Sequence, residues 1–123
     1  MEIAVAVVSG LLAVAFTAGG ITRLVVPAER YGAWPNQQWI RDVPRAGIIA
    51  ISIAEILGAV GLIVPVATGI APVLTPLAAC GLALIMIGAL VFHLRRREWP
   101  NVPVALVLIT LLTFVAISRF AGV

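Results

Sequence analysis

Four long apolar runs alternate with shorter polar stretches along this 123-residue chain. The runs cover about residues 3–26, 45–64, 72–94 and 101–120. Each is about as long as the ~20 residues that an α-helix needs to cross the hydrocarbon core of a bilayer. We therefore predict an all-α fold, a four-helix transmembrane bundle that forms one domain over residues 1–123.

The stretches between the runs differ in polarity. The stretch from Ala28 to Pro44 is rich in charged, amide and aromatic residues, and the aromatic ones favour the headgroup layer of a membrane. We expect it to lie on the membrane surface with a short helix after Pro35; the alternative is a lid over a cavity. The link around Gly69 is short and uncharged, so the second and third spans should form an antiparallel hairpin.

Prolines and small residues indicate where the spans end and how they pack. Pro65 should close the second span, and Asn101 is a candidate cap for the fourth. Gly58 and Gly61 permit a close approach between helices. The third span carries a mostly small stripe that we predict to be a contact seam, formed by Ala78, Gly81, Ile85, Gly88 and Phe92.

The composition excludes several classes of function. The chain is 63% hydrophobic and 11% charged, with a mean hydropathy of +1.19, which is typical of an integral membrane protein. Its pI of about 10.5 comes from arginines that mostly flank the spans, so we expect no nucleic-acid partner. A single Cys80 argues against a thiol–disulfide carrier. The first run lacks the basic start of a cleavable signal peptide and should remain as a span.

The arginines are distributed unevenly between the two ends of the predicted bundle. With four spans, both charged connectors fall on the same side. Seven arginines belong to that side and one, Arg119, to the other. Because cytoplasmic loops carry the excess of positive charge, we expect a multi-pass protein of the cell inner (plasma) membrane, with cytoplasmic connectors and both termini outside.

Glu55 stands in the middle of the second span. It lies ten residues past Arg45, about 15 Å deep and near the bilayer midplane. A charge at this depth costs at least about 2.5 kcal/mol unless it is paired, hydrated or protonated. Two interpretations stay open: a clasp that holds the helices together, or a carboxyl group that faces a ligand or exchanges a proton in a small cavity.

Arg23 and His93 lie near the connector ends of the first and third spans, and with Glu55 they can surround one cavity. These three are our candidate catalytic residues. The candidate ligand-binding residues are Thr17, Ser52 and Arg119. One histidine without a second soft ligand nearby disfavours a metal site within one chain, and the sequence identifies no cofactor.

Several short motifs match those of a known family. They are Gly20-x-x-Arg23-Leu24, Glu55-x-x-Gly58-Ala-x-Gly61-Leu62-x-x-Pro65, Thr75-Pro-Leu-Ala-Ala79-x-Gly81-Leu82, Met86-x-Gly88-Ala89-x-x-x-His93 and the late Arg119. Over nearly its whole length the chain resembles the DoxX-like small membrane proteins, a four-span group named after a subunit associated with a terminal quinol oxidase. The resemblance implies a four-helix membrane bundle and a loose link to respiratory or redox systems and to membrane assembly factors. Such proteins often have Lys at the position of Arg23; because arginine keeps its proton, its role here would be an anion clamp.

Three functions remain open on these grounds. The leading one is an intramembrane polar pocket of Glu55, Arg23 and His93 that binds a small apolar molecule or lipid. In an enzymatic form of this function the pocket also converts the bound molecule. As an enzyme it would perform acid–base chemistry of the isomerase, cyclase or epoxide-opening type, or serve as a redox-associated membrane subunit. The second function is a structural or assembly subunit of a respiratory or redox complex, and the third is a proton-coupled small transporter. The expected partners are the lipid bilayer, the apolar ligand, and a second copy or another membrane protein.

Overall fold

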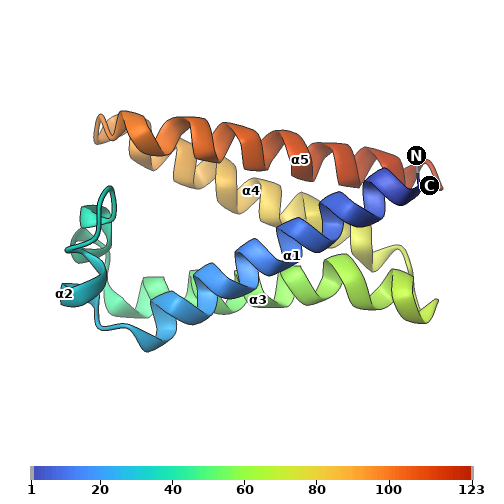
Figure 1. Cartoon of the computed structure of the whole chain (residues 1–123), viewed down its shortest axis with the longest axis horizontal. Helices are drawn as coiled ribbons and strands as arrows, with labels where there is room; N and C mark the ends of the chain where they lie inside the picture. Colours follow the sequence, from blue (N-terminus) through green and yellow to red (C-terminus); the bar gives the residue numbers. More distant parts are fainter. Residues whose placement is uncertain (1, 123) are drawn as a thin grey trace.

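The computed structural model describes residues 2–122, and within that range it contains helices and turns but no strand (Figure 1). The long helices are α1 (Glu2–Val25), α3 (Arg45–Thr68), α4 (Leu74–Arg95) and α5 (Val102–Phe120). The connectors contain short helical turns, namely α2 (Ala28–Tyr31), η1 (Gln38–Asp42) and η2 (Trp99–Asn101). The four long helical segments are long and apolar enough to cross a membrane, so the predicted all-α, four-helix transmembrane bundle is confirmed.

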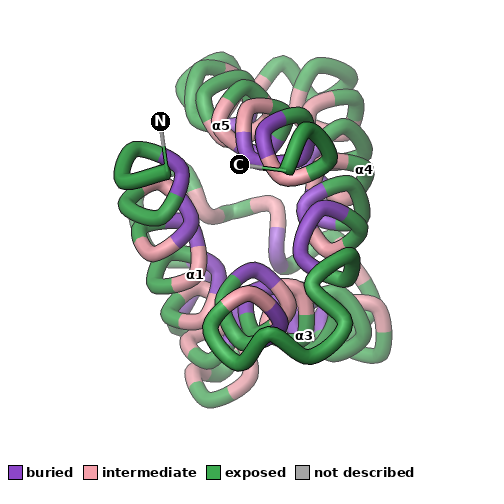
Figure 2. The backbone as a smooth tube through the Cα atoms, turned by 90° about the vertical axis from the view of Figure 1, so that its right-hand side faces the viewer, coloured by how far each residue is buried: buried purple, intermediate pink, exposed green. Residues whose placement is uncertain are grey.

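The long helices form two pairs that splay apart at one end. Helix α1 packs along α3, and α4 packs along α5, while a short turn joins α3 to α4. The two pairs approach each other at the end that holds both termini and lie apart at the end of the polar connectors (Figure 1). Seen end-on, the four helices form a ring with their buried residues on the inward sides (Figure 2).

The core consists of small and branched apolar residues with a few larger side chains. Its buried members are Leu12, Phe16, Ala59, Leu62, Ala79, Leu82, Met86, Leu112, Val115 and Ala116. Within lipid, close van der Waals packing holds helices together, because lipid tails are as apolar as the side chains themselves. The outer faces therefore carry exposed apolar residues without penalty.

Pro65 lies inside α3, although the sequence suggested that it would close the second span. The helix continues to Thr68 and ends at Gly69, whose φ of 74° is readily adopted by glycine. A proline inside a helix frees the carbonyl group four residues earlier, here that of Gly61. The hydroxyl group of Thr75 on α4 donates to this carbonyl oxygen at 2.9 Å. The helix passes through the proline because its neighbour replaces the lost hydrogen bond.

Helices α3 and α4 pack closely at two glycines of α3, which the sequence predicted to permit a close approach between helices. A Cβ atom at Gly58 would lie 2.6 Å from Leu82 Cδ2, and one at Gly61 would lie 2.7 Å from Ala78 Cβ. Both glycines lie in the half of α3 next to the hairpin. These two close approaches therefore lie in that half of the two helices.

The small-residue stripe predicted on α4 packs within the bundle only in part: Ala78 faces Gly61 of α3 and Ile85 packs against the core, but the two glycines do not. Gly81 and Gly88 are exposed, and a Cβ atom at either position would meet no atom within 4 Å. The buried face consists instead of Thr75, Pro76, Ala79, Leu82 and Met86. Helix α4 is apolar on all sides, so hydropathy allowed either face and the neighbouring helices decided between them.

Two polar side chains secure the connectors to the helix ends. Arg45 donates from Nη1 and Nη2 to the carbonyl oxygens of Arg23 and Leu24, both at 2.8 Å. These carbonyl groups belong to the last turn of α1, where a positive side chain complements the helix dipole. Asn101 occupies the N-cap position of the last span, but its side chain makes no capping hydrogen bond, and its Nδ2 group donates to the carbonyl oxygen of Asn36 at 3.0 Å. It therefore joins the two connectors.

Candidate functional site

Arg23 and Glu55 form an ion pair inside the bundle. Nη2 of Arg23 donates to Oε2 of Glu55, and the two side chains are 14% and 5% exposed, respectively. Arg23 lies in the last turn of α1, from which a long basic side chain usually extends to the headgroup layer. Here its Nη1 atom lies 3.5 Å from the position that a Cβ atom at Gly19 would occupy. The arginine is thus turned toward the carboxylate and away from the interface.

Gly20 explains how α1 brings Arg23 next to α3. A Cβ atom at Gly20 would lie 2.8 Å from Ile56 Cγ1 and 3.0 Å from the carbonyl oxygen of Ser52, so a side chain there would push the helices apart. Glu55 follows Ser52 by three residues and shares its buried face. The periodicity of the sequence predicted this face correctly.

The pairing makes two charges tolerable in an apolar environment. An isolated arginine or carboxylate at the centre of a membrane helix costs about 2.5–3.5 kcal/mol to insert. Arginine does not give up its proton in proteins, so its charge has to be compensated. Glu55 supplies that compensation. The pair alone therefore agrees with a clasp between α1 and α3, and its surroundings decide what else it can do.

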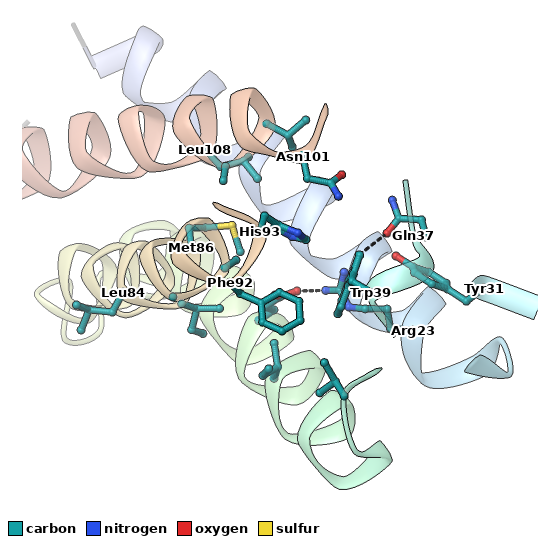
Figure 3. A pocket seen from close by; sticks show the side chains of 18 residues that line it. Arg23, Tyr31, Gln37, Trp39, Leu84, Met86, Phe92, His93, Asn101 and Leu108 are labelled. Carbon is teal, nitrogen blue, oxygen red and sulfur yellow. Dashed lines mark hydrogen bonds and ion pairs between the residues drawn. The ribbon is translucent and has the colours of Figure 1, made fainter. Parts of the chain in front are cut away.

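A cavity of about 530 Å³ lies between the splayed helices beside the ion pair (Figure 3). Arg23, Glu55 and His93 all line it, so the three predicted residues border one space. Its other walls on α4 and α5 are mostly apolar and consist of Leu84, Ile85, Met86, Gly88, Ala89, Phe92, Val104, Ala105 and Leu108. Polar side chains from the connectors border the same space, namely Tyr31, Gln37, Trp39 and Asn101. The cavity thus has a polar end and a longer apolar side.

A second cavity of about 120 Å³ also borders the ion pair. Its wall on α1 is formed by Ala15, Phe16 and Gly19. The residues common to both cavities are Arg23, Glu55, Met86 and Leu108. The charged pair is therefore not enclosed by packed side chains on all sides, as a purely structural pair would be.

The connector between α1 and α3 covers the splayed end of the bundle. The indole ring of Trp39 lies edge-on to His93 and Phe92, with ring centroids 5.8 and 6.3 Å apart, respectively. Its Nε1 group donates to Gln37 Oε1 at 2.9 Å, and both residues line the large cavity (Figure 3). This agrees with the lid alternative for the connector. Sequence reasoning treated Trp39 as an interfacial anchor, and only the density of aromatic and amide side chains in the connector pointed to a site.

His93 begins a series of polar contacts that joins the two connectors. Its Nδ1 atom lies 2.8 Å from Glu98 Oε1, which also accepts a hydrogen bond from Arg96 Nε at 3.1 Å. Nη2 of Arg96 donates to Asp42 Oδ2 on the other connector at 2.6 Å. The hydrogen bonds to Asp42 and Glu98 raise the pKa of Arg96, so this guanidinium stays charged. His93 lies at the rim, as expected, and Glu98 is the partner that the sequence did not identify.

The three candidate ligand-binding residues lie in different places. Ser52 is fully buried, and its Oγ atom has no hydrogen-bond partner in the part of the chain that the structure describes. Thr17 is half-buried on α1 and lines neither cavity. Arg119 lies at the opposite end of the bundle, where its Nη1 donates to Glu2 Oε1 at 2.8 Å. The structure therefore brings none of the three, Ser52 included, to either cavity.

The described residues do not assemble a metal site. Residues 2–122 contain no group of three or more His, Cys, Asp or Glu side chains that could hold a metal ion. His93 has Glu98 and two aromatic rings as neighbours. Cys80 is exposed on α4 and lines neither cavity. The polar groups that border the large cavity are thus a guanidinium, a carboxylate, an imidazole, a phenol, an indole and two amides.

Comparison with known proteins agrees with this architecture. Neither the curated proteins nor the solved structures yield a match to the chain. The model of the DoxX-like family matches residues 7–115, a range that contains the Arg23–Glu55 pair and parts of all four long helices. Because this match covers most of the sequence, the chain belongs to the DoxX-like family.

Proposed function

We propose that this membrane protein binds a small, mostly apolar molecule in the cavity beside the Arg23–Glu55 pair. The observation that carries the proposal is a buried ion pair on the wall of an otherwise apolar cavity of about 530 Å³. Small-molecule sites are typically apolar cavities of about 300–1,000 Å³ with a few placed polar groups. An ionisable group within a membrane span is by default a candidate for function.

The lining residues have separate roles in this proposal. Arg23 donates hydrogen bonds and Glu55 accepts them, so together they orient the polar group of the ligand. The apolar walls of α4 and α5 hold the remainder. His93 borders the site, and its contact with Glu98 fixes the imidazole ring. A clasp alone would need no cavity, because packed side chains would surround the pair.

We infer that the connector end of the bundle faces the cytoplasm of the inner (plasma) membrane. Seven of the eight arginines belong to that end, and Arg119 alone lies at the end with the termini. An excess of positive charge marks the cytoplasmic side of membrane proteins. Cysteines introduced at Glu29 and Gly122 test this orientation, since a membrane-impermeant thiol reagent added outside intact cells should label only the latter.

Mass spectrometry of the protein purified in mild detergent tests the binding function. The comparison is wild type against Glu55→Gln, with Glu2→Gln as the matched control. Glu2 is also paired with an arginine, Arg119, but that pair lies outside the cavity. We expect an apolar molecule to co-purify with the wild type and with Glu2→Gln and to be lost from Glu55→Gln. Its retention in Glu55→Gln, or a wild type that carries no small molecule, would contradict the proposal.

One observation favours a second candidate function, that of an assembly subunit. Gly81 and Gly88 lie on an open side of α4, where another helix would have room for close approach. A stoichiometric protein partner that co-purifies with Glu55→Gln but is lost from Gly81→Leu would support this alternative. The ligand-binding function predicts the opposite sensitivity, with Glu55 the essential residue.

A further inference from the structure

The large cavity reaches the outer surface of the bundle between α3 and α4. Four of its lining residues are exposed: Ile51 on α3, Leu84 and Gly88 on α4, and Val104 in the first turn of α5; three of the four lie on α3 and α4. Ile51 is six residues from the start of α3, and Leu84 is eleven residues from the end of α4. The opening therefore lies about 9–16 Å from the connector ends of these helices. At that depth a transmembrane helix is surrounded by lipid tails, so the opening faces the bilayer.

The splay of the helices creates this opening, and the connectors close the end next to it. The close contact at Gly58 and Gly61 holds α3 against α4 in the half next to the hairpin. Toward the connectors the two helix pairs lie apart (Figure 1). There Trp39 covers the cavity, and the Arg96–Asp42 ion pair ties one connector to the other. The arrangement favours entry from the side over entry from the aqueous end.

The charges that line the cavity are already compensated within the chain. Arg23 is paired with Glu55, and His93 contacts Glu98. A ligand with a net charge would bring an unpaired charge into an apolar space, which is unfavourable. A hydroxyl group can form a hydrogen bond with each partner of the Arg23–Glu55 pair, since it donates to a carboxylate oxygen and accepts from a guanidinium N–H.

We propose that the site is selective for a neutral amphiphile, a single apolar body with a hydroxyl head, which enters sideways from the bilayer between α3 and α4. This inference rests on the proposed function and adds to it the class of ligand and its route. Gly88 keeps the route open, because it lines the cavity at this opening and a Cβ atom there would have no neighbour within 4 Å, so a larger side chain has room to narrow the route. Gly81 is equally open, two turns earlier on α4, but does not line the cavity, so it offers a matched control.

Photo-crosslinking in phosphatidylcholine vesicles tests both parts of the inference. The probe is a long-chain alcohol with a diazirine midway along the chain, and matched probes carry a sulfate or a trimethylammonium head. The rate and the sites of labelling are measured by mass spectrometry for the wild type, Gly88→Leu and Gly81→Leu. Circular dichroism and gel filtration verify that both variants fold, which their open surroundings favour.

The alcohol should label the cavity walls of α4 and α5 saturably in the wild type. We expect its labelling to exceed that by either charged probe roughly tenfold, because of the cost of an unpaired charge. Gly88→Leu should slow labelling roughly fivefold, whereas Gly81→Leu should change the rate by less than about twofold.

The outcomes separate this inference from the proposed function. Equal or stronger labelling by a charged probe overturns the neutral class of ligand. An unchanged rate in Gly88→Leu, or an equal loss in both glycine variants, overturns the lateral route. In each of these cases saturable labelling of the wild type leaves the proposed function standing. A wild type that shows no saturable labelling with any of the probes overturns both.

Discussion

Replacement of Glu55 by glutamine probes the ion pair on which both interpretations of the site depend. The substitution keeps the shape of the side chain but removes the charge that compensates Arg23. Loss of one partner of a buried ion pair costs about 3–5 kcal/mol, because the other charge stays behind. Arg23 lies two residues from the end of α1, only about 3 Å along the helix axis, so it can turn toward the headgroup layer and recover part of this cost. We therefore expect the lower end, a loss of about 3 kcal/mol in the free energy of unfolding.

Equilibrium unfolding by sodium dodecyl sulfate in mixed micelles, followed by tryptophan fluorescence, measures this loss. The three tryptophans, Trp34, Trp39 and Trp99, all lie in the connectors. Glu29→Gln, which alters an exposed carboxylate in α2, is the control and should stay within about 0.5 kcal/mol of the wild type. The double variant with Arg23→Gln should lose less than the sum of the two single variants, by at least about 1 kcal/mol.

The reasoning would be refuted by a stability of Glu55→Gln within about 0.5 kcal/mol of the wild type together with additive losses in the double variant. That result would mean that Arg23 is compensated by water or headgroups and that its contact with Glu55 contributes nothing. The measurement concerns only the energetics of the pair, so it is independent of which ligand the cavity takes.

Three further experiments test the contacts that hold the helices in place. Gly61→Ala should cost about 1–3 kcal/mol in the same assay, because its Cβ atom would meet that of Ala78. Gly81→Ala is the control and should be neutral or stabilise by up to about 1 kcal/mol. Equal effects of the two substitutions would contradict the assigned faces of α3 and α4. Arg45→Met removes two hydrogen bonds to carbonyl groups in the last turn of α1 and should cost about 1–3 kcal/mol. Amide hydrogen exchange in that turn should also become faster. Unchanged exchange would show that these bonds do not hold the helix end. Thr75→Val should cost about 1–2 kcal/mol in the wild type, because it removes the hydrogen bond to the carbonyl oxygen of Gly61. The cost should be clearly less in a Pro65→Ala background, where this carbonyl group regains a helical partner. Equal costs in both backgrounds would contradict the idea that Thr75 is what allows α3 to continue through Pro65.

Much of the fold and part of the site could be predicted from the amino-acid sequence. Hydropathy placed the four spans, because each must present about 20 apolar residues to lipid. The depth of Glu55 made it a candidate that needed a partner, and Arg23, one of the residues predicted to share its cavity, forms the ion pair. The spacing of Ser52, Glu55, Ala59 and Leu62 predicted the buried face of α3, which is marked by polar and small residues.

Other features were misjudged for identifiable reasons. Pro65 suggested a helix end because the partner of the carbonyl group it frees, Thr75, is on another helix. Asn101 resembled a helix cap, but its amide group reaches the other connector instead. Trp39 and Glu98 were absent from the predicted site, because their positions depend on how the two connectors fold against each other.

The amino-acid sequence alone was sufficient for the class of protein, the number of spans and the need to compensate a charge within them. These properties follow from the transfer of residues between water and lipid, which depends on composition and spacing. Only the tertiary structure decided which face of α4 packs inward, where the helices splay, and that a cavity of about 530 Å³ lies beside the ion pair. The reason is that lipid tails and protein interiors are equally apolar, so hydropathy cannot separate a face that meets a helix from one that meets lipid. That choice depends on the close fit of residues such as Gly20, Gly58 and Gly61 against particular neighbours, which the tertiary structure alone reveals.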